Sequence, residues 1–225
     1  EEMTGDADVG LTSQFMYLIK GDESRWYAGP TWDFDCIMGN ADTPMYKIPS
    51  ALTASIQVSR AEESGDQNRW FSALWKHAGF RDMVANKYKS VFRDVYEDIY
   101  FNKVDQYVES IQRAAILDAL RWHAKRIDWW FLRIDGLTFP EDDTYAGFDT
   151  LDESVEVVKE YMSKKLIFLD KLWIENRDFC IVEVRNSVEF LDPWYNQTLY
   201  YWVEKGTAIE NLPCYEAPDY SFDGY

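Results

Sequence analysis

The sequence predicts an α+β fold, in which a β-hairpin and a strand pack on a helical region and a smaller β-rich segment follows. Three observations lead to this class: strand-like aromatic runs before position 40, helical periodicity between about positions 70 and 176, and strand-like runs after it. The chain has 225 residues, of which 47% are hydrophobic and 17% aromatic, so it can bury a sizeable core.

The first predicted elements are a β-hairpin and a third strand. Residues 15–20 (FMYLIK) and 25–27 (RWY) are strand-like, and residues 21–24 supply the turn between them. Residues 31–37 (TWDFDCI) alternate large apolar residues with aspartates, which predicts a strand with two faces. Residues 38–65 show no sustained period, and we expect a long loop there.

Amphipathic helices follow. The spacing of apolar residues predicts two helices between positions 70 and 96, separated at Gly79, and a third over about 104–132, long enough to need a kink or break. A Thr-x-x-Glu pattern at 150–153 predicts the start of another helix, which ends near Asn176.

A second β-rich region closes the chain. Strand-like runs return at 179–184 and 199–203. No change of composition marks a linker before them. We therefore expect one domain over residues 1–177 and a partial β-rich module over residues 178–225.

The charge balance excludes several classes of protein. The chain carries 23 Lys and Arg against 40 Asp and Glu, a net charge of −17, which repels phosphate backbones and anionic lipid. We expect no nucleic-acid binding, and no membrane insertion because no stretch approaches the roughly 18 apolar residues of a membrane span. The chain has only two histidines and no CxxC pair among its three cysteines, so we expect any metal to have oxygen ligands. The sequence does not decide whether Cys180 and Cys214 form a disulfide.

The candidate functional residues lie on the predicted third strand. Asp33 and Asp35 are two apart, so on a strand both carboxylates project to one face. Paired carboxylates suit Mg²⁺, which takes hard oxygen ligands and completes its shell with water and substrate phosphates. An edge strand with its polar face in solvent explains the same pattern, and the spacing does not decide between the two readings.

Three short motifs surround these aspartates: YLIK at residues 17–20, GPTWDFD at 29–35 and MGN at 38–40. They resemble the Tyr-Leu-Tyr-Lys strand, the Gly-Pro-x-Trp-Asp-Phe-Asp motif and the Phe-Gly-Asn of the spore-coat-protein-H-like (CotH) kinase family. The resemblance covers roughly residues 1–175 and implies an atypical kinase-like fold. It also implies ATP and Mg²⁺ as cofactors, and transfer of the γ-phosphoryl group to hydroxyls of a Ser-rich protein substrate.

The resemblance assigns roles to individual residues. Asp8 matches the candidate catalytic base, at the end of a Thr-x-Asn-x-Asp stretch in which this chain has Asp6 in place of Asn. Asp33 matches the metal-binding Asp, with Asp35 close enough to assist, and Asn40 would orient that shell as a cofactor-binding residue. Because the family's nucleotide-gripping lysine and covering loop lie upstream of the catalytic loop, residues 1–225 are expected to lack the N-terminal lobe and to be inactive alone.

The end of the chain carries a second resemblance. VEKG at 203–206, Pro213 and YSFDGY at 220–225 are similar to the internalin-type B-repeat (Listeria–Bacteroides repeat) of bacterial surface proteins, cut off at the last residue. This implies an extracellular or cell-surface protein, associated with polysaccharide through flanking modules. A generic β-sheet appendage explains the same residues. The alternative function is a non-catalytic scaffold or glycan-binding protein, because the 10 tryptophans include candidates for sugar stacking.

Overall fold

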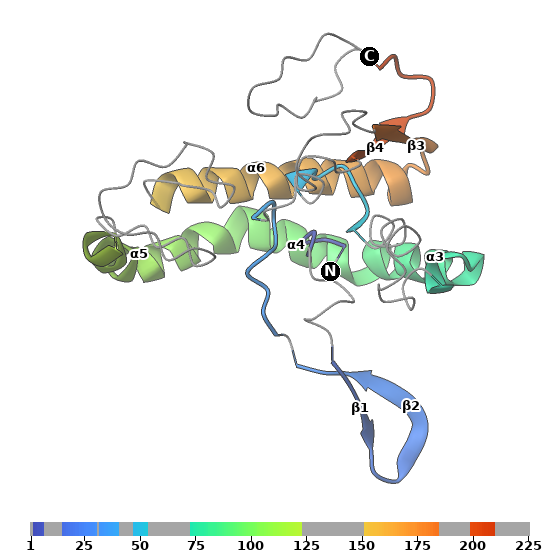
Figure 1. Ribbon diagram of the computed structural model, residues 1–225, viewed down its shortest axis with the longest axis horizontal. Helices are drawn as coiled ribbons and strands as arrows, with labels where there is room; N and C mark the ends of the chain where they lie inside the picture. The colour runs from blue at the N-terminus through green and yellow to red at the C-terminus, as the bar shows by residue number, and fades with distance from the viewer. Residues whose placement is uncertain are drawn as a thin grey trace, which may run out of the picture.

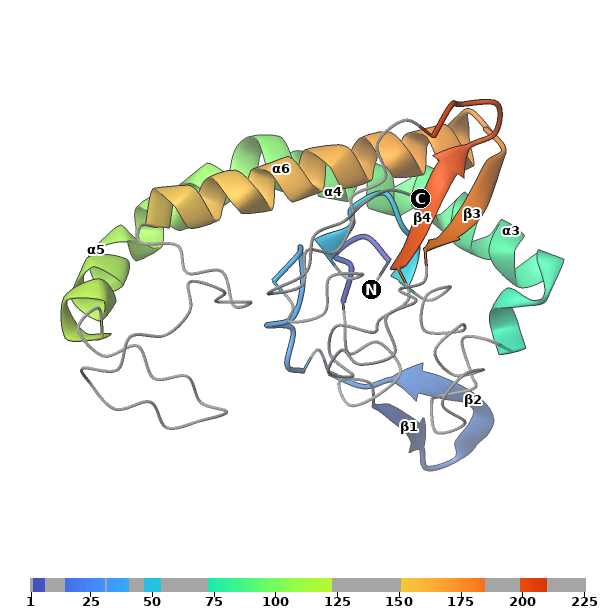
Figure 2. The same ribbon diagram turned by 45° about the horizontal axis from the view of Figure 1, so that its top comes forward.

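The computed structural model describes residues 2–6, 15–30, 32–40, 47–53, 73–122, 151–184 and 199–209. Its main feature is two long helical rods that lie side by side (Figure 1). One β-hairpin projects from this helical layer, and another lies at the carboxyl end of the second rod (Figures 1 and 2). This mixture of helices and antiparallel strand pairs agrees with the predicted α+β class.

The first rod is continuous from residue 78 to residue 122. The expected helical character and the separation of two helices in this region are confirmed, but the break lies at Lys76 and His77 rather than at Gly79: residues 73–75 are helical, and the next helix begins at Ala78 with His77 as its N-cap. Two π-helical turns interrupt the α-helical geometry without ending the rod, because a π turn takes up an extra residue within a helix. The second of them, at residues 99–103, joins the helix predicted to end near position 96 to the one predicted to begin near 104, so the rod is continuous there. The rod consists of α3 (Ala78–Lys87), η2 (Tyr88–Phe92), α4 (Arg93–Asp98), η3 (Ile99–Lys103) and α5 (Val104–Trp122).

The second rod packs along the first. It consists of α6 (Leu151–Leu169) and the π-helical turn η4 (Asp170–Ile174). Asn176 follows with a positive φ of 53°, a conformation that Asn tolerates after a helix end, which confirms the predicted end of this helix. Thr150, the first residue of the expected capping pattern, lies outside the described residues.

The predicted β-hairpin and the two strands predicted near the end of the chain are confirmed, and the structure shows that these two strands also pair with each other. Strands β1 (Met16–Ile19) and β2 (Asp22–Ala28) pair antiparallel, with Gly21 at a φ of 91° in the turn between them. Strands β3 (Phe179–Val184) and β4 (Leu199–Glu204) pair antiparallel in an unbroken register.

The expected third strand is absent: residues 32–37 form a loop. Asp33 has a φ of 57°, in the left-handed region, and a single residue there ends the extended geometry that a strand requires. The argument that placed Asp33 and Asp35 on one strand face is therefore wrong. The two aspartates instead share a loop.

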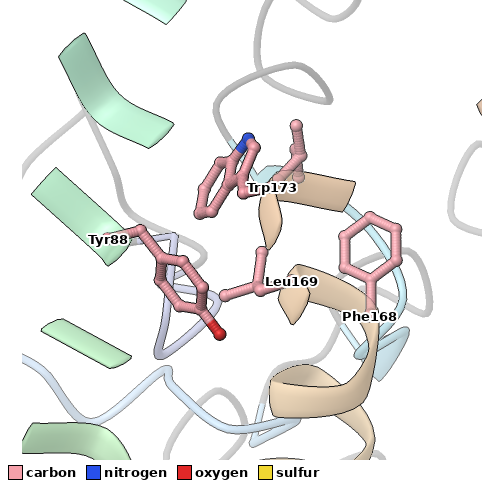
Figure 3. Packing of buried hydrophobic residues seen from close by; sticks show 5 residues of the cluster. Tyr88, Phe168, Leu169 and Trp173 are labelled. Atoms are coloured by element: carbon pink, nitrogen blue, oxygen red, sulfur yellow. The ribbon is translucent and has the colours of Figure 1, made fainter. Parts of the chain in front are cut away.

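A buried aromatic cluster joins the two rods (Figure 3). The ring of Tyr88 in η2 lies 5.1 Å from that of Trp173 in η4, and Phe168 meets Phe179 of β3 edge-on at 5.3 Å. Fully burying a side chain of this size stabilises the fold by about 1.5–3 kcal/mol. The cluster consists of Leu52, Tyr88, Phe168, Leu169 and Trp173.

A polar network closes the same contact. The Tyr88 hydroxyl donates to Asp170 Oδ1 at 2.8 Å, and Arg93 donates to both Asp170 oxygens through Nε and Nη2, each at 3.0 Å. Arg93 Nη1 also donates to Glu97 at 3.0 Å. Burial, together with the Asp170 carboxylate, raises the pKa of Tyr88 well above its ordinary value. Asp170 thus binds the second rod to the first.

Replacing Asp170 with Ala is expected to lower the free energy of unfolding by about 2–3 kcal/mol, because the Tyr88 hydroxyl and the Arg93 guanidinium both lose their partner. Urea unfolding followed by circular dichroism measures this change. The matched control is Glu160→Ala, which breaks the exposed Lys164–Glu160 pair and should cost no more than about 0.5 kcal/mol. Equal effects of the two variants would contradict the structural role given to Asp170.

The β3–β4 hairpin packs on the rest of the described structure. Tyr200 and Tyr201 are buried with Ala51, and Trp202 contacts the aromatic cluster. Glu204 of β4 lies 3.5 Å from both Lys171 Nζ and Arg177 Nη1. The domain boundary at 177 and the B-repeat stay predictions, and residues 210–225 lie outside the described residues.

Candidate functional site

The structure places three of the four sequence-predicted site residues in one loop. Asp33, Asp35 and Asn40 lie within residues 32–40, and all three side chains are exposed. Asp8, the candidate base, lies outside the described residues. The loop that precedes it, residues 2–6, is described and packs on the core.

A tight turn closes the loop that carries the aspartates. Met38 and Gly39 have φ values of 54° and 86°, and the Asn40 N–H donates to the Ile37 carbonyl at 2.9 Å. Positive φ at both central residues is typical of a type I′ turn, and Gly39 takes it without strain. The Asn40 side chain donates from Nδ2 to the Asp35 carbonyl at 2.8 Å. Asn40 therefore holds the backbone beside Asp35, and its role toward a nucleotide stays a prediction.

The loop before Asp8 lies against this turn. The Met38 N–H donates to the Thr4 carbonyl at 2.6 Å, so residues 2–6 and 32–40 are joined directly although they are far apart in the chain. Asp6 is only 1% exposed, and the candidate base follows it by two residues. The structure thus brings together the two segments that the sequence motifs identified separately.

Tyr161 of α6 lies beneath both loops. A Cβ atom added at Gly5 would be 1.9 Å from the Tyr161 hydroxyl oxygen, and one added at Gly39 would be 3.3 Å from its Cδ2 atom. Both glycines have positive φ, and because neither has a Cβ atom, the Tyr161 ring can pack directly against them. Burial raises the pKa of Tyr161 above its ordinary value, and the negative charge of Glu2 adds to the rise. Sequence reasoning missed Tyr161, although a glycine in each motif was a signal for close packing.

Lys165 lies one helical turn beyond Tyr161 and is fully buried. Its ammonium donates to the Ala51 carbonyl, and the carboxylate of Glu2 opposes the effect of burial on its charge. Burial lowers the pKa of Lys165 to about 8. Glu2 in turn accepts the Thr53 N–H at 2.7 Å. A lysine on an amphipathic helix is normally solvated, and sequence reasoning therefore did not single out Lys165.

Comparison with protein families matches residues 1–169 to the family described as CotH kinase protein. The chain belongs to the CotH kinase family. The matched range includes both site loops, the β1–β2 hairpin and α6, and ends before β3. No curated protein and no solved structure matches the chain.

Membership in the CotH family relates the chain to proteins of the spore coat, an extracellular or surface location. Within the helices that the structure describes, no segment is both long enough and apolar enough to span a bilayer.

The residues of this CotH loop fit the metal expected from the resemblance. Asp33 and Asp35 offer exposed hard oxygen donors, and Mg²⁺ binds one or two carboxylates while water and phosphates complete its shell. The described residues contain no cluster of three or more His, Cys, Asp or Glu side chains that would enclose a metal by themselves. Asp33 also has the left-handed backbone often found at ligand sites. The donor set thus suits a cation shared with a nucleotide.

Proposed function

We propose that this CotH protein is the catalytic part of a secreted, Mg²⁺- and ATP-dependent protein kinase that phosphorylates Ser or Thr hydroxyls. The observation that carries the proposal is the hydrogen bond from Met38 N–H to the Thr4 carbonyl, which holds the segment before Asp8 beside the loop of Asp33 and Asp35. A base and a metal-binding carboxylate must lie on either side of the transferred phosphoryl group. In this proposal, the segment that leads to Asp8 and the loop of Asp33 and Asp35 would supply these two groups.

In the proposed phosphoryl transfer, the acidic residues of the two loops would have different roles. Asp33 and Asp35 would hold Mg²⁺, which when bound neutralises charge on the β- and γ-phosphates. Asp8 would accept a hydrogen bond from the substrate hydroxyl and orient its oxygen toward the γ-phosphorus. As the new O–P bond forms and the bond to the ADP oxygen breaks, the hydroxyl proton passes to the Asp8 carboxylate. A Ser-rich protein outside the cell is the proposed substrate.

A non-catalytic glycan-binding protein is the second candidate. Trp26 and Trp32 favour it, because they are 62% and 60% exposed and aromatic faces stack on sugars. Trp173, by contrast, is buried in the aromatic cluster. Nucleotide binding distinguishes the two functions, since a glycan-binding protein has no need of Mg²⁺ and ATP.

Replacing Asp33 with Asn is expected to abolish binding of Mg²⁺ with ATP to the natural full-length protein while its thermal melting stays nearly unchanged. The reason is that an exposed loop carboxylate contributes to the metal shell and little to the fold. Isothermal titration calorimetry measures the binding. Asp82→Asn, at an exposed position of α3, is the matched control and should bind as the wild type does. Unaltered binding in Asp33→Asn would refute the metal assignment.

A further inference from the structure

Two buried side chains of α6 pack against the segments that form the candidate site. Tyr161 and Lys165 are four residues apart and therefore lie on the same side of the helix, one turn from each other. Tyr161 is 5% exposed and Lys165 is 0% exposed. Neither is part of the proposed chemistry, and neither belongs to the motifs of the loops.

Each of the two side chains contacts more than one segment of the site region. The Tyr161 ring fills the space beside Gly5 and Gly39, one from each site loop. The Lys165 ammonium binds the Ala51 carbonyl and attracts the Glu2 carboxylate, which also accepts the Thr53 N–H. One face of α6 therefore contacts residues 2–6, 32–40 and 47–53 together.

We infer that Tyr161 and Lys165 are positioning residues, which hold the loop before Asp8 and the loop of Asp33 and Asp35 at a fixed separation. The inference rests on the proposed kinase function for its catalytic consequence, but the mechanical part stands on the contacts alone. A misplacement of about 1 Å between reacting groups costs as much as 100-fold in rate, so a shared platform has a direct effect on turnover.

The burial of Lys165 supports this role. A buried ammonium costs free energy unless hydrogen bonds and an opposite charge compensate, and an apolar side chain of similar length often gives a more stable protein. Stability alone therefore does not explain a lysine at this position. A directional bond to Ala51 and a charge on Glu2 specify where the flanking segments lie, which an apolar side chain cannot do.

The test compares Lys165→Met with Lys164→Met, its exposed neighbour on α6, in hydrogen–deuterium exchange of this chain. We expect Lys165→Met to speed exchange of the Met38 and Thr53 amides at least about 10-fold, because both amides donate hydrogen bonds to residues 2–6. Lys164→Met should leave both amides unchanged, and melting of the two variants should stay similar. Unchanged exchange in Lys165→Met would overturn the inference.

A second variant covers the case in which Lys165→Met does not fold. Glu2→Gln keeps the shape of the side chain, removes its charge and leaves one oxygen as acceptor, so it should speed exchange at Thr53 while the aromatic cluster stays protected. Protection of Thr53 equal to that of the wild type would contradict the role of the Lys165–Glu2 attraction.

Steady-state kinetics of the natural full-length protein test the catalytic consequence. Tyr161→Leu, which removes the ring beside Gly5 and Gly39, and Lys165→Met should each lower kcat about 10-fold or more with less than about a threefold change in KM for ATP, because the groups are misplaced and the nucleotide contacts are kept. Faster loop exchange without any phosphoryl transfer in the wild type would leave the positioning role intact and refute the kinase. Loss of kcat with loop exchange unchanged would refute the positioning role instead.

Discussion

Replacing Asp8 with Asn is expected to lower kcat for phosphoryl transfer by about 10²–10⁴-fold with little change in nucleotide affinity. A general base acts only in the transition state, so its loss leaves ground-state binding intact. Residues 2–6, which precede Asp8 in the chain, are held against Met38 and Tyr161, beside the loop of Asp33. Steady-state kinetics with a Ser-rich acceptor, together with calorimetric ATP binding, measure both quantities in the natural full-length protein.

Two other outcomes of this experiment are informative. An exposed carboxylate in a solvated turn contributes within about 0.5 kcal/mol, so unchanged turnover and unchanged melting would remove Asp8 from the mechanism. Equal losses of binding and turnover would instead indicate a metal ligand shared with Asp33, and the base would then have to be another residue. Asp82→Asn is again the matched control, since it removes one exposed carboxylate at a distance in the chain.

The elements that depend on local patterns could be predicted from the sequence. The strands of both hairpins follow from runs of aromatic and β-branched residues, and the helix end near Asn176 follows from a loss of periodicity. The predicted turn at 21–24 was too long, because β2 begins at Asp22. Such elements can be predicted because their residues have the local preference for the structure that they form.

The strand expected at 31–37 shows where a local pattern is insufficient. Alternation of apolar and acidic residues predicts extended backbone, yet Asp33 adopts a left-handed conformation and the chain turns at Met38 and Gly39. Aspartate tolerates the left-handed conformation better than most residues do, so the same sequence is compatible with a strand or with a loop. The motif nevertheless identified the loop that carries the candidate metal ligands.

The parts of the candidate site that were missed depend on long-range packing. Helical spacing places Lys165 on the same face as Met162 and Leu169, but its partners, Ala51 and Glu2, come from segments far away in the chain, so the sequence does not show what compensates its burial. The hydrogen bond between Met38 and Thr4 likewise joins segments whose meeting no periodicity predicts. Single-sequence reasoning finds motif residues more readily than the side chains that support them.

Replacing Gly5 with Ala is expected to lower the free energy of unfolding by about 2–4 kcal/mol. The new Cβ would be 1.9 Å from the Tyr161 hydroxyl oxygen, and the φ of 64° is itself unfavourable for Ala. Gly21→Ala is the matched control, because Gly21 has a φ of 91° but no atom within 4 Å of an added Cβ. It should cost only about 1 kcal/mol. Urea unfolding measures both variants.

A double-mutant cycle with Tyr161→Phe tests whether the Gly5 effect comes from this contact. Removing the hydroxyl leaves Cζ as the nearest atom, 3.0 Å from the added Cβ, so the severe overlap becomes a tight contact. We therefore expect Gly5→Ala to cost about 1–2 kcal/mol less in the Tyr161→Phe background than in the wild type. If Gly5→Ala lowers the free energy of unfolding no more than Gly21→Ala does, residues 2–6 do not pack on α6. Additive effects would mean that strain at Gly5, rather than its contact with Tyr161, determines the loss.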